Sequence, residues 1–431
     1  MKKIGIFLLL CAAVLFSGCF LDPAESLYAI PARSADYYNL QSAIEKEMPA
    51  GAVYCAPIAG ENQQPVQMAD LDGDHQDEAI VYWKGNGDFP LTISVFDKRG
   101  DQFVLVAKAD GAGSAFDHVQ YVEIDGNPGS EIVVGRQISE QVTQTLYVYS
   151  LENDTLTEMM NANYSQFITA DLDADGLHDV VLLHSADNAN GIAECYRWVG
   201  GQLTRDREAR MSAPVGAVRR MIAGKVWNDS PAVFVTAEYG EGMIVTDIFG
   251  IHEDTFTNLS LSDGNDTAVS TIRDYYVYCC DIDADGLIEL PHLIDLAPIA
   301  GDETSKNQAV IRWYNLQPDG REKEKWLTYH SYSGGWYLKL PERLTDGLAV
   351  KYTTVFETYR GYTFIHKGKE LFTLTAVSGE NAAGTVTGWT VLAAKGDTIY
   401  AILVKDKALT DPETQELFHF IQVDWKTGET D

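Results

Sequence analysis

The sequence predicts a mainly β fold of about five repeated four-stranded units, followed by a smaller C-terminal domain that is also mainly β (α+β). Five times, an apolar stretch leads into a cluster of polar turn residues and then into a strand. These clusters begin at residues 70, 123, 171, 224 and 281, so they are 48 to 57 residues apart. A regular period of this size is typical of repeated supersecondary units.

The cluster has three clear copies and two weaker ones. The clear copies read DLDGDHQDE at 70–78, DLDADGLHD at 171–179 and DIDADGLIE at 281–289. The weaker copies are EIDGNPGSE at 123–131 and the segment 224–232, which has lost nearly every acid. The acids of the clear copies stand at positions 1, 3, 5 and 9 of the cluster, so the spacing is a property of the repeat.

This spacing favours calcium binding. A hard cation such as Ca²⁺ takes about six to eight oxygen ligands from carboxylates and main-chain carbonyls. Asp, Asn and Gly also gather in tight turns for conformational reasons alone. Three copies with the same four acidic positions favour the calcium interpretation over a simple turn.

The clear copies resemble the calcium loops of FG-GAP and VCBS-type repeats, which form the blades of integrin-like β-propellers. The last acid stands at position 9, whereas an EF-hand has it at 12. The resemblance implies that side chains at positions 1, 3, 5 and 9 and the carbonyl at position 7 bind Ca²⁺ as a structural ion. The implied ligands are Asp70, Asp72, Asp74, Gln76 (carbonyl) and Glu78; Asp171, Asp173, Asp175, Leu177 (carbonyl) and Asp179; and Asp281, Asp283, Asp285, Leu287 (carbonyl) and Glu289.

The other copies depart from this pattern. In the first copy His75 replaces the turn glycine, so it must adopt a positive φ, which is uncommon for a non-glycine residue, or the loop is altered. The copy at 123–131 keeps oxygen ligands at Glu123, Asp125, Asn127 and Glu131 but has Pro128 at the turn, which leaves a fourth ion open. In the copy at 224–232 only Asn228 offers a side-chain oxygen at a ligand position, so no ion is expected there.

The strands after each cluster follow a constant order. The first unit has an entering strand at 66–69 and further strands at 79–83, 91–97 and 102–107. Four-stranded sheets repeated radially form a β-propeller. Many short strands also suit a sandwich, but the constant step favours blades over residues 51–340. The later units are expected at 131–134, 145–150 and 155–159; at 166–170, 180–184, 192–199 and 202–204; at 232–238, 243–251 and 255–261; and at 308–316 and 323–340.

The N-terminus is typical of a secreted lipoprotein. Residues 1–18 have a basic start and a short apolar core, as a signal peptide does. The sequence LFSGC that ends at Cys19 resembles the lipobox of bacterial lipoproteins, which implies a lipid on Cys19 and attachment to the outer side of the cell membrane. An ordinary signal peptide or a buried helix are the alternatives. A linker is expected at 19–33 and a short amphipathic helix at 34–50, stopped by Pro49.

The acid motif ends before residue 341. Strands expected at 350–357, 362–366, 370–377, 388–394, 398–405 and 416–423 predict a separate β-rich domain over 341–431. Further degenerate blades are the alternative, but the strand spacing there does not repeat.

The composition restricts the partners. The chain has 63 Asp and Glu against 32 Lys and Arg, a net charge of −31. Such a surface repels nucleic acid, whose binding needs basic patches. Cys55, Cys195, Cys279 and Cys280 have no metal-binding spacing. A secreted protein can form disulfides, but buried free thiols are expected here, since the neighbours Cys279 and Cys280 point to opposite faces of a strand.

No catalytic motif stands out in the sequence, with no GxSxG, HExxH or P-loop pattern. We therefore expect a binding, adhesion or scaffold module for a polysaccharide, peptide or protein partner, with no catalytic residues. The alternative is a five-bladed glycoside hydrolase that uses a carboxylate pair. Tryptophans in the strands could stack on sugars, although strand tryptophans are more often core. They are Trp83, Trp198, Trp227, Trp313 and Trp336.

Overall fold

The computed structural model describes residues 34–138, 144–186, 190–261, 267–273, 277–317, 321–341, 344, 346–356, 358–406 and 417–421. The expected signal peptide, Cys19 and the linker lie outside these ranges. No helix within them is long and apolar enough to cross a membrane.

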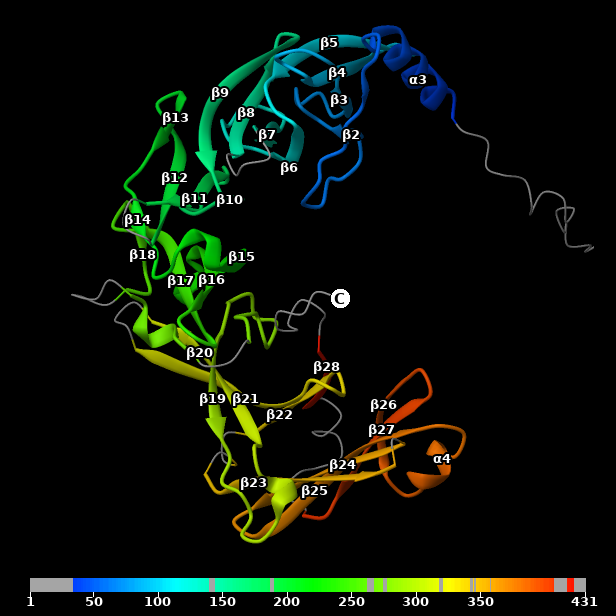
Figure 1. The fold of residues 1–431 in the computed structure, drawn as a ribbon, viewed down its shortest axis with the longest axis vertical. Coiled ribbons are helices and arrows are strands. Elements are labelled where there is room, and N and C mark those ends of the chain that lie inside the picture. Colours follow the sequence, from blue (N-terminus) through cyan, green and yellow to red (C-terminus); the bar gives the residue numbers. More distant parts are fainter. Residues whose placement is uncertain are drawn as a thin grey trace, which may run out of the picture.

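Six antiparallel sheets follow one another along an arc (Figure 1). Most of their strands are joined to the next strand in the sequence, as in the expected blades. The first sheet contains β1 (Val53–Tyr54), β2 (Val66–Ala69), β3 (Glu78–Lys84), β4 (Leu91–Arg99) and β5 (Gln102–Gly111). The second contains β6 (Ala115–Val122), β7 (Glu131–Gln137), β8 (Gln144–Glu152) and β9 (Thr155–Tyr164). The third contains β10 (Gln166–Ala170), β11 (Asp179–Ser185), β12 (Gly191–Val199), β13 (Gln202–Arg205) and β14 (Ala209–Arg210).

The fourth sheet contains β15 (Val218–Lys225), β16 (Pro231–Tyr239), β17 (Met243–His252) and β18 (Thr255–Asn258). The fifth contains β19 (Leu290–Asp295), β20 (Ala309–Leu316), β21 (Glu322–Ser331), β22 (Trp336–Leu340) and the late strand β28 (Phe418–Phe420). The sixth contains β23 (Leu348–Val355), β24 (Tyr359–His366), β25 (Lys369–Ser378), β26 (Thr390–Lys395) and β27 (Thr398–Val404).

Each sheet packs against the next, because its second strand is apolar on both faces. Neighbouring residues of a strand point to opposite faces. In β7, Ile132 and Val134 belong to the core shared with the first sheet, whereas Val133 belongs to the core shared with the third. In β11, Val180 and Leu182 face the second sheet, whereas Val181 and Leu183 face the fourth. The continuous apolar runs after each acid cluster therefore fill two inter-sheet cores.

This architecture confirms the mainly β prediction and the four-stranded repeat, and it is consistent with a propeller-like arrangement. Among the described residues, however, no strand joins the first sheet to the sixth. In Figure 1 these two sheets lie at opposite ends of an open arc. The closed ring of about five blades is therefore not observed, and the blade count stays a prediction.

The C-terminal segment differs from the expectation in one strand. We expected 416–423 to belong to the C-terminal domain, but β28 pairs with β22 in the fifth sheet, with Trp336 opposite Phe420. One hydrophobic core also joins β20–β22 of the fifth sheet to β23–β27 of the sixth, for example through Leu338 and Phe364. The proposed domain boundary near residue 341 thus crosses a shared core.

Helix α3 (Ala35–Glu47) confirms the short helix expected before the first sheet. Ser34 caps its start, since its Oγ accepts a hydrogen bond from the N–H of Tyr37 at 3.2 Å. Ile44 packs on Val81 and Trp83 of β3, so the helix covers the outer face of the first sheet. Four short 3₁₀ turns and the short helix α4 (Ala382–Thr385) lie in the connections. The 3₁₀ turns are η1 (Val215–Ala217), η2 (Trp227–Asp229), η3 (Val269–Thr271) and η4 (Glu303–Ser305).

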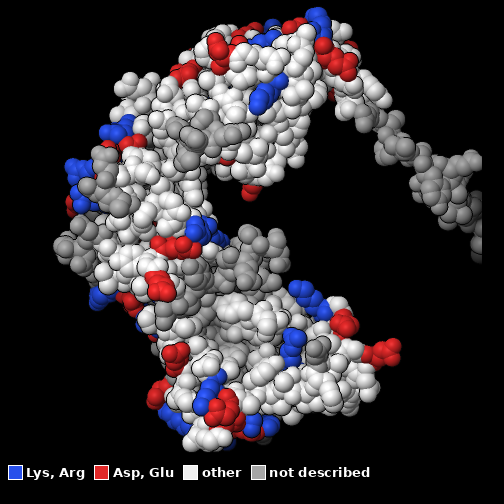
Figure 2. Space-filling view, viewed as in Figure 1, with Lys and Arg blue, Asp and Glu red and all other residues white. Residues whose placement is uncertain are grey.

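The four cysteines are free, as predicted, and Cys195, Cys279 and Cys280 are buried, whereas Cys55 is only half-buried. On the face shown in Figure 2, acidic and basic side chains are interspersed over the surface. The exclusion of nucleic acid stays a prediction from net charge.

Candidate metal centres

The acid clusters lie in equivalent places of the fold. The first three form the loops β2–β3, β6–β7 and β10–β11. The acid at position 9 is the first residue of the strand that follows each of these loops, as with Glu78 in β3. In the fifth sheet, Glu289 pairs with Cys280 in an isolated bridge just before β19.

The loops bring carboxylates together at four places. In each place, one oxygen from each of three acids lies within 4.8 Å of the others. In the first loop the structure gathers positions 1, 3 and 9, and in the third and fifth units it gathers positions 1, 3 and 5. The copy at 123–131, which the sequence left open, also forms such a group. The four groups are Asp70, Asp72 and Glu78; Glu123, Asp125 and Glu131; Asp171, Asp173 and Asp175; and Asp281, Asp283 and Asp285.

The remaining predicted ligands lie beside these groups, and their role stays a prediction. Asp74, Asp179 and Glu289 belong to the same loops but not to the three-acid groups. Gln76, Leu177 and Leu287 were expected to offer carbonyls. Their N–H groups donate to the Asp side chains two residues earlier, at 2.8, 2.8 and 2.9 Å.

The acid at position 9 closes each loop by a hydrogen bond to its own backbone. The Leu71 N–H donates to Glu78 Oε2 at 2.7 Å, and the same bond recurs from Ile124 to Glu131, Leu172 to Asp179 and Ile282 to Glu289. In all four loops the donating N–H belongs to a residue whose apolar side chain is buried. The hydrophobic anchor at position 2 therefore fixes the loop, and the acid at position 9 satisfies its N–H.

The turn geometry agrees with the repeat. His75 has φ of 69°, close to the region that Gly176 and Gly286 occupy at 93° and 88°, so the first loop keeps its shape despite the missing glycine. Position 4 is left-handed as well, at Gly73 and Gly126 and also at Ala174 and Ala284, and the two glycines are the only sign of this in the sequence of the four loops. In the second copy the positive φ moves from Pro128, whose ring fixes a negative φ, to Gly129 at 112°.

Burial makes the position-9 carboxylates unusual. Glu78, Glu131, Asp179 and Glu289 are each at most 4% exposed. Loss of solvation raises the pKa of each to about 7. Glu78 Oε1 is buried and has no hydrogen-bond partner among the described residues. A buried carboxylate oxygen of this kind needs a proton or a cation as a partner.

Basic side chains distinguish the loops from one another. Lys325 on β21 pairs with Asp285 and lies 3.7 Å from Asp283, and the Trp326 indole donates to Asp283 at 2.7 Å. Arg197 on β12 lies 3.4 Å from Asp173. In the first loop the exposed His75 ring lies 3.8 Å from Asp70. The fifth loop is thus the most compensated by protein charge.

The copy at 224–232 differs as expected. Asn228 and Asp229 have positive φ in a 3₁₀ turn, and no group of three acids forms there among the described residues. The expected absence of an ion in this loop stays a prediction.

The residues fit a calcium ion in the first loop best. Its donor set consists of hard carboxylate oxygens, as Ca²⁺ prefers, and it contains the unpartnered Glu78 oxygen. Asp283 Oδ1 of the fifth loop is also buried without a partner, but Lys325 lies 3.7 Å from Asp283 and already compensates its charge. Asp70, Asp72 and Glu78 would hold the ion, which would neutralise three acids packed close together.

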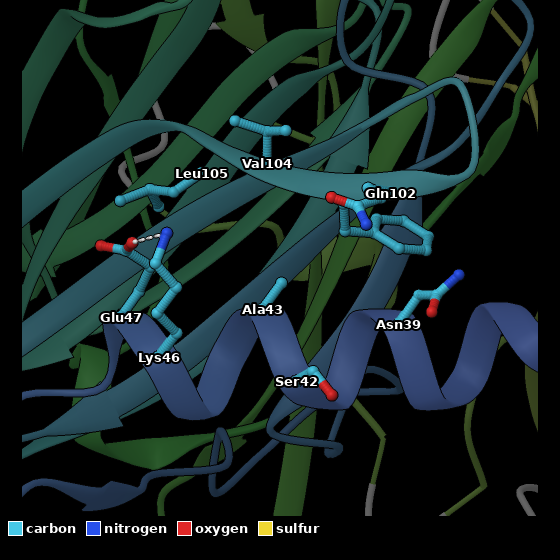
Figure 3. A pocket seen from close by; sticks show the side chains of 9 residues that line it. Asn39, Ser42, Ala43, Lys46, Glu47, Gln102, Val104 and Leu105 are labelled. Carbon is cyan, nitrogen blue, oxygen red and sulfur yellow. Dashed lines mark ion pairs between the residues drawn. The ribbon is translucent and has the colours of Figure 1, made fainter.

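A surface pocket of about 450 Å³ lies between helix α3 and strand β5 (Figure 3). Lys46 and Glu47 line it as an ion pair with an N–O distance of 3.6 Å. No acid of the repeated loops lines this pocket, so it is separate from the metal centres. Among the tryptophans considered for sugar stacking, Trp83, Trp313 and Trp336 are buried core residues, whereas Trp198 and Trp227 are partly exposed.

No protein-family model matches this chain, and no curated protein sequence matches it. Among solved structures, this chain is similar to the Bacillus licheniformis rhamnogalacturonan lyase PL11, at 12% identity and a TM-score of 0.30, over 81% of this chain and 72% of that one. A protein from Lactobacillus plantarum matches at 13% identity and a TM-score of 0.28, over 73% and 84% of the two chains. The exotype rhamnogalacturonan lyase YesX matches at 12% identity and a TM-score of 0.29, over 84% and 73%. Similarity at this level assigns no activity to this chain.

Proposed function

We propose that this chain is a membrane-anchored, extracytoplasmic binding or scaffold module whose sheet array is stabilised by calcium. The observation that carries the proposal is the recurrence of a three-acid group in the equivalent loop of the first, second, third and fifth units. These acids accept hydrogen bonds from their own loop backbones, so they serve the architecture of the loop. A polysaccharide, peptide or protein partner would then bind to the surface that the array holds in place.

Calcium dependence is tested by thermal unfolding with calcium and with EGTA. Extracellular modules bind calcium with Kd on the order of 10⁻⁴–10⁻³ M, so about 1 mM calcium stabilises each occupied site by up to about 1.4 kcal/mol. We expect Asp72→Asn to lose the calcium-dependent stabilisation of one site. In EGTA the variant should be no less stable than the wild type, since it relieves repulsion between like charges.

Asp229→Asn is the matched control, because Asp229 lies in the fourth loop, has a positive φ that Asn tolerates, and forms a 3.9 Å surface pair with Lys225. Its calcium-dependent shift should equal that of the wild type. The same loss in both variants, or no calcium effect on the wild type, would contradict the proposal.

The binding role is tested separately. Native gels cast with purified polysaccharides measure retardation with calcium and with EGTA, and chemical cross-linking on intact cells measures peptide or protein partners. We expect one of these assays to report a specific interaction in calcium. Failure of both, with the calcium effect intact, would leave only a structural role for the ion and overturn the binding role.

A further inference from the structure

A small polar pocket lies where the fifth sheet meets the sixth. Its volume is about 120 Å³, and its lining comes from the β21–β22 turn and from β22, β24, β25 and β27. Ser333 at its rim is exposed, so the pocket opens to solvent there. It contains none of the repeated acids and does not depend on the proposed function.

The pocket holds a buried donor without an acceptor. Trp336 is fully buried, lines the pocket, and its Nε1–H has no hydrogen-bond partner among the described residues. A side chain at Gly334 would fill this space, since a Cβ there would lie 2.6 Å from Trp336 Nε1. A buried N–H without an acceptor is costly, so this geometry calls for an acceptor from outside the chain.

The electrostatics of the pocket favour an anion. Arg360 on β24 lines it, and no ion pair to Arg360 is found among the residues that the structure describes. None of the described lining residues is acidic, although the whole chain has a net charge of −31. Burial raises the pKa of Tyr400 and the positive charge of Arg360 opposes that rise, so the guanidinium acts on the pocket interior.

Apart from the Ser333 hydroxyl, which is exposed at the rim, the other polar side chains of the pocket already have partners. The Tyr400 hydroxyl donates to the Gly334 carbonyl at 3.3 Å, and Ser378 and Thr398 hydroxyls are 2.7 Å apart. The free donors are therefore the indole N–H and the guanidinium. Two such donors match the two oxygens of one carboxylate, with the charge-assisted bond from arginine as the stronger contact.

We propose that this pocket binds a small free monocarboxylate of the size of acetate or lactate. The volume of about 120 Å³ lies below the roughly 300–1,000 Å³ of pockets for drug-sized ligands, yet it exceeds what a single water needs. The carboxylate would accept from Trp336 and Arg360, and its short apolar tail would lie toward Ala376, which also lines the pocket.

The test is a titration of the ¹⁵N-labelled protein with sodium acetate and sodium lactate at constant ionic strength, in EGTA so that calcium plays no part. The readout is the set of indole N–H cross-peaks from the eight tryptophans. We expect one peak to shift saturably, and Trp336→Phe to lack that peak. In Arg360→Gln the peak should remain, but the acetate affinity should fall about tenfold or more, since the charge-assisted bond is lost.

Arg207→Gln is the matched control, because Arg207 is exposed and the substitution changes the net charge equally. It should leave the titration unchanged. Absence of a saturable indole shift, or an equal shift in Arg360→Gln and the wild type, would overturn the proposal even if Trp336→Phe fails to fold. Inorganic phosphate that moves the peak as strongly as acetate would also overturn it, since the pocket would then be a general oxyanion site.

Discussion

At the scale of single residues, a basic side chain beside an acid cluster opposes the calcium binding that we propose for that cluster. Lys325 lies at the acids Asp283 and Asp285 of the fifth loop. Burial is the largest single influence on Asp285 and raises its pKa, but the hydrogen bond and charge of Lys325 together with the Leu287 N–H outweigh it, and the pKa falls below its usual value. A calcium ion in this loop must therefore act against a fixed positive charge.

Replacing this lysine should strengthen calcium binding at the fifth loop. A unit charge about 4 Å away contributes about 1 kcal/mol at high dielectric, so Lys325→Gln should tighten the weakest calcium step about fivefold. Isothermal titration calorimetry measures the change. Lys323→Gln is a control, because Lys323 is exposed on the same strand. Weaker or unchanged binding in Lys325→Gln would show that the loop does not bind the ion.

His330 on β21 makes the stability of the fold depend on pH. Its Nε2 lies 2.8 Å from Thr328 Oγ1, its Nδ1 is buried without a partner, and its ring stacks on Tyr337 at 5.2 Å. Burial lowers its pKa from 6.5 to about 3. The unfolded chain therefore binds the proton first, so stability from the neutral ring is fully present above pH 6.5 and is lost as the pH falls from 6.5 toward 3.

We expect the free energy of unfolding to fall by about 1–2 kcal/mol on account of His330 when the pH is lowered from neutral to about 5. Urea unfolding of the wild type and of His330→Gln at both pH values measures this difference, because other groups titrate equally in the two proteins. The variant should lose less stability on acidification. An equal loss in both proteins would mean that the ring is protonated in the folded state.

At the scale of elements, successive loops are tied to each other. The Ser130 N–H donates to the Asp70 carbonyl at 3.0 Å, and the His178 N–H donates to the Glu123 carbonyl at 2.7 Å. Both bonds link position 8 of one loop to position 1 of the loop before it. Pro231 holds position 8 in the fourth loop and has no N–H, so it cannot make this bond to the third loop. The ordered loops thus link the first three sheets.

The contact between the first and second loops should be destabilised by a larger side chain. Gly129 has φ of 112°, and a Cβ there would lie 2.3 Å from the Leu71 carbonyl oxygen of the preceding loop. Gly87 has φ of 103° with nothing within 4 Å. Gly87→Ala should therefore cost about 1 kcal/mol for backbone strain alone, and Gly129→Ala about 1–3 kcal/mol more for the clash. Denaturant unfolding measures both, and equal costs would contradict the contact between the loops.

At the scale of the whole molecule, each sheet is stabilised by the hydrophobic cores that it shares with its neighbours. Each inter-sheet core is shared by consecutive sheets, and the last one joins β20–β22 to β23–β27. Arrays in which each unit contacts its neighbours gain stability from each interface. Strand β28 returns to the fifth sheet, so the C-terminal segment is part of this array.

The membrane location is a prediction for the intact chain. Cys19 follows Ser17 and Gly18 in the lipobox-like sequence, and the acidic chain is repelled by anionic headgroups. Cys19→Ser should therefore abolish diacylglyceryl modification and yield either secreted protein or an unprocessed precursor. Mass spectrometry and cell fractionation measure this. An unmodified N-terminus beyond Cys19, with wild-type protein free in the medium, would contradict lipid anchoring.

The sequence by itself determined the repeat, the strand order and the loops. The repeated acids of each clear copy lie within nine residues, and apolar runs such as Val180 to Leu183 follow each loop, so local chemistry specifies both. His75 adopts the left-handed turn because the flanking acids hold its backbone, with Asp70 accepting the His75 N–H at 3.1 Å. The helix start at Ser34 was also readable, since its cap is a local hydrogen bond.

Only the tertiary structure decided which partners meet across the sheets. Lys325 lies beside Asp285, which is 40 residues earlier, and Arg360 shares a pocket with Trp336 of another sheet. The pairing of β28 with β22 and the open arc of sheets likewise depend on contacts between distant parts of the chain. Such contacts depend on how whole sheets stack, and the spacing of residues within one repeat carries no information on that stacking.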